Sequence, residues 1–155
     1  MKSIMQKIIL LSGFLLSILF TGIANAQFWE IPDPALPYIA KVRADPSWGY
    51  AVIYNSKICE QIGDACAFFR AHEYAHAFLN HMYLPPDAYP EFDERKADCW
   101  AAQYIKPNEA LAAAQLFEDN VGKKDLPLFG DPAQRAQRIR ECVKEKGVWI
   151  GKGNY

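Results

Sequence analysis

Two short motifs on separate segments constrain the fold of this chain more than any other feature. Residues 72–76 read H-E-x-x-H, and Glu94, eighteen residues after His76, begins an E-x-x-x-D sequence that ends at Asp98. Two histidines four residues apart on a helix lie about 40° apart around its axis, so both imidazoles point the same way. Glu73, between them, points to one side. We therefore expect two helical segments to meet around one polar site.

The first motif has the geometry of a catalytic zinc site. His72 and His76 suit two corners of a zinc tetrahedron, and Glu73 can reach a water on the metal but not the metal itself. Catalytic zinc takes a third protein ligand and leaves its fourth position for water. We predict Glu94 as that third ligand, and the swapped assignment, with Asp98 on the metal, stays open.

Asp98 lies four residues after Glu94, on the same face of the predicted helix. A metal-bound histidine usually donates its other ring N–H to a carboxylate or a carbonyl. We predict that Asp98 accepts such a hydrogen bond from His72 or His76. The alternative is a carboxylate near a helix N-terminus on a solvated face.

Three other polar residues near these motifs are predicted to lie outside the metal site. Asp93 and Glu91 are spaced wrongly to share the face of Glu94, so we interpret them as surface charges that favour the first helical turn. His81 is five residues beyond His76, whereas a metzincin places its third histidine six residues beyond. We therefore interpret His81 as a helix-end residue and not as a ligand.

A hydrolytic site also needs a donor for the oxyanion that forms on the substrate. Arg135 and Arg138, three residues apart on one face of the predicted last helix, are candidates, and so are Tyr104 and Tyr83. We expect Cys142 to tether that last helix beside the site.

The first 26 residues are predicted to be a signal peptide. Lys2 and Lys7 give it a positive start, residues 8–20 are an apolar stretch of 13 residues, and residues 24–26 read A-N-A, an A-x-A cleavage site. A membrane helix needs about 20 apolar residues. We expect cleavage after residue 26, leaving a domain over residues 27–155 without a stable membrane span, in a bacterial periplasm or the extracellular space. An uncleaved anchor is the alternative.

The charge of the mature chain argues against several partners. Removing Lys2 and Lys7 leaves 15 basic and 18 acidic residues, a net charge of −3. No basic stripe is present, so nucleic acid and anionic membrane surfaces are poor partners. We expect a peptide or protein substrate, and the sequence indicates no particular oligomeric state.

All four cysteines lie beyond the predicted signal peptide, and an even number in an exported chain suggests two disulfides. Of the three possible pairings we predict Cys59–Cys66, tying a strand end to the histidine helix, and Cys99–Cys142, stapling the last helix to the glutamate helix. A structural zinc site made of all four cysteines is disfavoured because no C-x-x-C pair exists.

The sequence predicts an α+β fold, a mainly helical single domain with a small β-sheet. Residues 27–46 are rich in proline and aromatic residues and are predicted to be an extended arm, while residues 50–54 form a strand that pairs near residues 40–43. Helices are predicted over residues 64–82, 90–105, 107–120 and 132–146. We expect Asp64 and Asp131 to cap the first and last of them.

The two motifs together resemble the gluzincin zinc metallopeptidases, the clan that includes thermolysin. The resemblance implies roles for five residues: zinc ligands His72, His76 and Glu94, general base Glu73, and Asp98 supporting a histidine. It also implies a catalytic helix that packs against a small sheet, with the glutamate helix beside it.

Further likeness points to the prenyl-protease type of metallopeptidase. Residues 94–98, E-R-K-A-D, are similar to the E-x-E-A-D signature of that type, with Lys96 in place of its second glutamate. Asp131-Pro132 followed by Arg138-Ile139 is similar to its H-P…R-I element, with Asp131 in place of the histidine. The multiple membrane helices of full-size prenyl proteases are absent, so the chain looks like a minimal secreted relative.

We therefore expect an exported zinc metallopeptidase in which Glu73 is the general base. One alternative is a zinc-binding relative that has lost catalysis and binds a partner, although the intact Glu73 favours catalysis. Another is a disulfide-stapled structural or inhibitor protein without metal. Phe28, Trp29 and Trp48, in or near the predicted arm, either cover the cleft as a pro-segment or form part of it.

Overall fold

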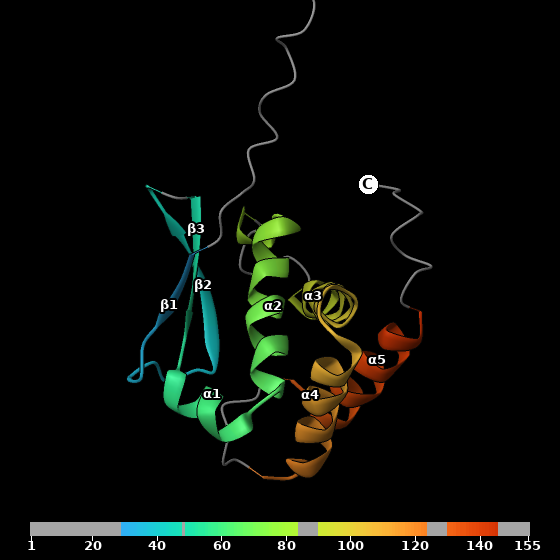
Figure 1. Cartoon of the computed structure of the whole chain (residues 1–155). Coiled ribbons are helices and arrows are strands. Elements are labelled where there is room, and N and C mark those ends of the chain that lie inside the picture. The colour runs from blue at the N-terminus through green and yellow to red at the C-terminus, as the bar shows by residue number, and fades with distance from the viewer. Residues whose placement is uncertain (1–28, 48, 84–89, 124–129, 146–155) are drawn as a thin grey trace, which may run out of the picture.

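A small β-sheet and a group of helices lie on opposite sides of one central helix, α2 (Ala65–Phe78) (Figure 1). The structure is a computed structural model, and it describes residues 29–47, 49–83, 90–123 and 130–145. The predicted signal peptide, residues 1–26, lies outside these ranges. The arrangement confirms the predicted α+β fold, mainly helical with a small sheet.

The sheet has three strands in the order β1-β3-β2: β1 (Trp29–Pro32), β2 (Ala40–Asp45) and β3 (Gly49–Tyr54). The predicted pairing of the last two strands is confirmed, because β2 runs antiparallel to β3 with Val42 opposite Val52. The predicted arm is partly wrong, because β1 pairs with β3 in parallel. Among the described strands, β2 lies at one edge of the sheet, and it is the strand that packs most closely against α2.

Helix α1 (Ser56–Ile62) was not predicted. The carboxamide oxygen of Asn55 accepts a hydrogen bond from the backbone N–H of Ile58 at 3.0 Å, which caps the first turn of this helix. The predicted disulfide Cys59–Cys66 is confirmed. Because Cys59 lies in α1, the bond joins two consecutive helices and not a strand end to a helix.

Three of the remaining helices agree with the predicted ones to within two residues: α3 (Pro90–Tyr104), α4 (Pro107–Asp119) and α5 (Pro132–Lys144). A single 3₁₀ turn, η1 (His81–Tyr83), was not predicted as a separate element. Asp131 caps α5 as predicted, accepting from the backbone N–H of Gln134 at 3.0 Å. Asp64 does not cap α2 with its side chain, because its own backbone is already helical. Helix α2 ends at Phe78, four residues before the predicted end.

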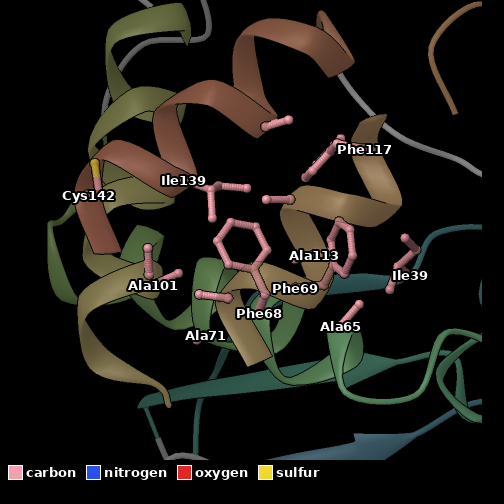
Figure 2. Close-up of a cluster of buried hydrophobic side chains, with 14 residues drawn as sticks. Ile39, Ala65, Phe68, Phe69, Ala71, Ala101, Ala113, Phe117, Ile139 and Cys142 are labelled. Atoms are coloured by element: carbon pink, nitrogen blue, oxygen red, sulfur yellow. The ribbon is translucent and has the colours of Figure 1, made fainter. Parts of the chain in front are cut away.

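The main hydrophobic core lies between α2, α4 and α5, with α3 closing one side (Figure 2). Phe68, Phe117 and Ile139 are fully buried at its centre. Around them the helices contribute mostly alanines: Ala71, Ala101, Ala102, Ala110, Ala113, Ala114 and Ala136. Since helix separation depends on the side chains at the contact, these alanines let the helices approach closely. A smaller cluster of Val42, Val52 and Ala77 joins the sheet to α2.

The second predicted disulfide, Cys99–Cys142, is also confirmed and joins α3 to α5. Two disulfides in one domain indicate an oxidising compartment, because cytosolic thiols are kept reduced. Within the described ranges, no helix combines the length and the apolar character that crossing a membrane requires.

Candidate metal centre

Helix α2 presents the first motif between the helical core and the sheet. His72 is buried, with 5% of its surface exposed, on the face that also carries Phe68 and Ala75. His76 lies one turn further along, and its Nε2 is 3.0 Å from the Nε2 of His72. Both ring nitrogens therefore point at the same space, as the four-residue spacing predicted.

Helix α3 brings the predicted third ligand to this space. The Glu94 carboxylate lies 3.1 Å from Nε2 of His72 through one oxygen and 3.2 Å from Nε2 of His76 through the other. One donor atom from each of the three residues lies within 4.8 Å of the others, so the group could hold a metal ion. The expected convergence of the two helices is thus present. Asp98 is not part of this group.

Asp98 lies behind His72, where the sequence placed a supporting carboxylate. It is fully buried, and its Oδ1 is 3.0 Å from Nδ1 of His72. Its other contacts come from α5: Nε of Arg135 donates to Oδ2 at 3.0 Å, Nη1 of Arg138 donates to Oδ2 at 2.9 Å, and Nη2 of Arg135 donates to Oδ1. A buried carboxylate with three partners holds the Nδ1 of His72 in place and fixes the position of α5 against α3.

These contacts shift the pKa values of the site in the metal-free protein. Burial by itself would lower the pKa of His72, but its hydrogen bonds to Asp98 and Glu94 raise the pKa to about 9. Burial opposes ionisation of Glu94 and Asp98 as well. Hydrogen bonds with His72 and His76 nevertheless hold the pKa of Glu94 well below its usual range, and His72 and Arg135 do the same for the pKa of Asp98.

The far ring nitrogen of His76 also has a partner, and the sequence did not predict it. Nδ1 of His76 lies 3.1 Å from Nδ1 of His81, and Nε2 of His81 lies 3.5 Å from a carboxylate oxygen of Asp93. Burial lowers the pKa of His81. The prediction that Asp93 is a solvated surface charge is wrong, since only 14% of its side chain is exposed. The side chain of Glu91 lies outside the described residues.

Glu73 points sideways from α2 to the edge of the sheet. Its Oε2 accepts a hydrogen bond from the backbone N–H of Val42 at 2.8 Å. That N–H therefore points away from β3, along the edge of β2 that no other described strand covers. In an antiparallel strand, alternate residues face the same way, so the N–H groups of Ala40 and Ala44 lie on this edge too.

A pocket of about 310 Å³ opens between α2, α3 and the edge of β2. Its lining residues are Tyr38, Ala40, Lys41, His72, Glu73, His76, Glu94 and Arg135. The three possible metal ligands and the proposed base therefore face one cavity, together with one of the predicted oxyanion donors.

Two of the other predicted oxyanion donors, Arg138 and Tyr104, do not line this pocket. Arg138 contacts Asp98 behind His72, as described above. Tyr104 is 69% exposed, and its ring stacks on Trp100 at a centroid distance of 4.5 Å. Ten residues separate Tyr104 from Glu94, or about 15 Å along the axis of α3, which explains its distance from the site. The side chain of Tyr83 lies outside the described residues.

Comparison with known proteins adds nothing to this geometry. The chain matches no protein-family model, no curated protein and no solved structure.

Proposed function

We propose that this protein is an exported zinc metallopeptidase of gluzincin type. One observation carries the proposal: His72, His76 and Glu94 present donor atoms within 4.8 Å of one another in a pocket that Glu73 also lines. Two imidazoles and one carboxylate are the donor set of the catalytic zinc in several peptidases. Zinc held there would polarise a peptide carbonyl and make a water more acidic.

The roles of the protein groups follow from their positions. Glu73 lies beside the ligands but is not one of them, so it is free to take a proton from the attacking water and to deliver it to the leaving amine. Asp98 keeps the proton of His72 on Nδ1, which leaves the Nε2 lone pair for the metal. Arg135 faces the same pocket, and its positive charge supports the oxyanion that forms on the scissile carbonyl.

The edge of β2 has no partner strand in the part of the chain that the structure describes, and this supports a peptide as the substrate. An extended chain can add to an exposed sheet edge through backbone hydrogen bonds, which recognise any sequence. The edge of β2 borders the pocket through Ala40 and Lys41. A peptide that pairs with this edge would pass the metal ligands and would compete with Glu73 for the N–H of Val42.

A second candidate function is zinc binding without catalysis. The hydrogen bond from Val42 to Glu73 favours it, because it gives the proposed base a structural contact between α2 and β2. In this case the pocket would bind a partner segment along the same edge and would not cleave it.

The deciding experiment combines metal analysis with hydrolysis of an unfolded protein such as casein. We expect about one zinc per chain, and we expect Glu73→Gln to keep the zinc while losing at least about 100-fold in rate, the low end for general-base catalysis. Glu60→Gln, at an exposed position on α1, is the matched control and should cleave like the wild type. If the wild type and Glu73→Gln both bind zinc and neither cleaves casein, the second function, zinc binding without catalysis, would be favoured.

The proposed location is a bacterial periplasm or the extracellular space. The disulfides support an oxidising compartment, and the sequence of residues 1–26 supports export. Mass spectrometry of protein recovered from culture medium or periplasm should find Gln27 as the first residue. A mature chain that still begins at residue 1 would contradict cleavage.

A further inference from the structure

The neighbourhood of His76 contains a second buried carboxylate–histidine contact. His81 is only 6% exposed through its side chain, and it lies between Asp93 and the Nδ1 of His76. The rings of His76 and His81 meet edge to face, with centroids 5.2 Å apart. None of the roles proposed above uses His81 or Asp93.

We propose that His81, oriented by Asp93, is a positioning residue that fixes the ring of His76 for metal binding. The inference rests on the proposed metal centre and not on peptide cleavage. It assigns to His76 the kind of support that Asp98 gives to His72.

The donors fit this role when zinc is bound. The carboxylate of Asp93, 3.5 Å from the Nε2 of His81, favours a proton on that nitrogen and leaves the Nδ1 of a neutral His81 as an acceptor. Zinc on the Nε2 of His76 would leave the one proton of that ring on Nδ1, which lies 3.1 Å from the Nδ1 of His81 and would donate to it.

The same logic applies to the first histidine, so the two supports act together. Asp98 accepts from Nδ1 of His72, and the Nε2 of that ring is likewise turned to the ligand group. With zinc on both Nε2 atoms, each imidazole would therefore have a partner for the proton on its opposite nitrogen. A ring without such a partner would be held less firmly in the orientation that the metal requires.

The chain places His81 here only because α2 stops before it. On a continuing helix, a residue five positions after His76 would lie about 140° away around the axis. Instead Asn80 adopts a left-handed conformation with φ of 59°, the only positive φ among the described non-glycine residues. Asparagine is one of the few residues that ends a helix in this way. The turn brings His81 back against His76.

The first test is zinc affinity, measured by competition with a chromophoric chelator on purified protein. His81→Phe keeps the ring but has no acceptor, and we expect it to weaken zinc binding about 10–100-fold, as is typical when such a support is lost. His81→Gln offers a carbonyl acceptor and should recover part of the loss. Met82→Leu, at the exposed neighbouring position, is the matched control. Unchanged affinity in His81→Phe would overturn the proposal.

The second test reads the ring proton of His76 directly in the zinc-loaded protein. Nitrogen-15 NMR of the wild type should show a slowly exchanging proton on Nδ1 of His76, held by His81. Asp93→Ala keeps the ring of His81 but removes the carboxylate that orients it, so this proton should exchange faster with water. This variant also covers the case in which His81→Phe fails to fold.

The outcomes separate this inference from the peptidase proposal. An Nδ1 proton of His76 that exchanges equally fast in the wild type and in Asp93→Ala would overturn the positioning role even if the protein cleaves casein. Conversely, weakened zinc binding in His81→Phe with no cleavage by the wild type would support the positioning role and reject catalysis.

Discussion

Asp98 is the residue on which most of the site depends. Its buried carboxylate meets one nitrogen of His72 and the guanidinium groups of Arg135 and Arg138, so it joins α3 to α2 and to α5. A buried charge is tolerated only when it is paired and hydrogen-bonded, and here every partner is itself charged or polar. Loss of this one charge should therefore affect both folding and metal binding.

We predict that Asp98→Asn lowers the free energy of unfolding by about 3 kcal/mol or more, because it leaves Arg135 and Arg138 without their buried counter-charge. The amide would also present a donor to His72, and zinc affinity should fall about 10–100-fold. Chemical denaturation and chelator competition measure the two effects.

The control for this prediction is an ion pair on the surface. Glu118→Gln removes the charge that contacts Arg140, whose shortest distance is 2.7 Å, but the Glu118 side chain is exposed and solvent screens the pair. The unfolding midpoint should hardly change. Equal destabilisation by both substitutions would contradict a special role for the buried carboxylate.

Proton release should accompany zinc binding near neutral pH. The folded pKa of His72 is raised to about 9, above the usual 6.5, so the metal-free protein holds a proton on this ring at pH 7.5. Zinc requires the neutral ring and displaces about one proton. Glu94 releases none, because its lowered pKa means that it is already ionised.

The pH dependence follows from the same shift. Apparent zinc affinity should rise from pH 6.5 to about 9 and then level off as His72 becomes neutral without metal. Titration calorimetry in buffers of different ionisation enthalpy counts the protons at each pH. Release that does not diminish by pH 9.5 would contradict the raised pKa of His72.

Spacing along one helix explains which site residues the sequence could predict. His72 and His76 share a face of α2, and Glu94 and Asp98 share a face of α3, so periodicity alone places each pair correctly. His81 and Asp93 were missed because their contact depends on the left-handed turn at Asn80. No periodic pattern reports such a turn, although an asparagine just before a predicted helix end is a usable signal.

Among the elements, α5 depends most on a covalent link. Cys99–Cys142 closes a 43-residue segment and holds α5 against α3, whereas Cys59–Cys66 closes only 7 residues between neighbouring helices. Loop-closure entropy predicts about 4 kcal/mol for the longer loop and about 2.4 kcal/mol for the shorter one. The longer bond also keeps the two arginines of α5 near Asp98.

We predict that replacing Cys99 and Cys142 together by alanine lowers the midpoint of thermal unfolding more than replacing Cys59 and Cys66. The first pair of substitutions should also weaken zinc binding, because Asp98 loses contact with α5. Calorimetry of the two double variants makes the comparison. A larger loss from the Cys59 and Cys66 pair would contradict the order derived from loop length.

Long-range pairing explains which elements the sequence did not predict. The hairpin of β2 and β3 is local, and α3, α4 and α5 each begin at a proline, so these elements follow from the chain order. Strand β1 pairs in parallel with β3 on the side opposite β2, and its exposed residues show no alternation. Its pairing depends on contacts such as Glu30 with Arg70 at 2.7 Å, which no local pattern contains.

At the scale of the whole molecule, the possible metal ligands come from two helices that belong to different parts of the chain. His72 and His76 lie on α2, which also packs on the sheet, while Glu94 lies on α3 at the far side. The unfolded chain does not hold these groups together. An ion that binds all three therefore binds the folded state and shifts the folding equilibrium toward it.

We predict that zinc raises the thermal midpoint of the wild type relative to protein in EDTA. At free zinc about 100 times its dissociation constant, linkage gives about 2.7 kcal/mol, which corresponds to roughly 10 °C for a domain of this size. Binding to the unfolded chain should not cancel the effect, because all four cysteines are in disulfides. The quantity to compare is the rise of the thermal midpoint that zinc causes. Glu94→Gln should lose most of this rise, and Glu60→Gln should keep it. An identical wild-type midpoint with zinc and with EDTA would mean that the two histidines and the glutamate do not act as one metal site.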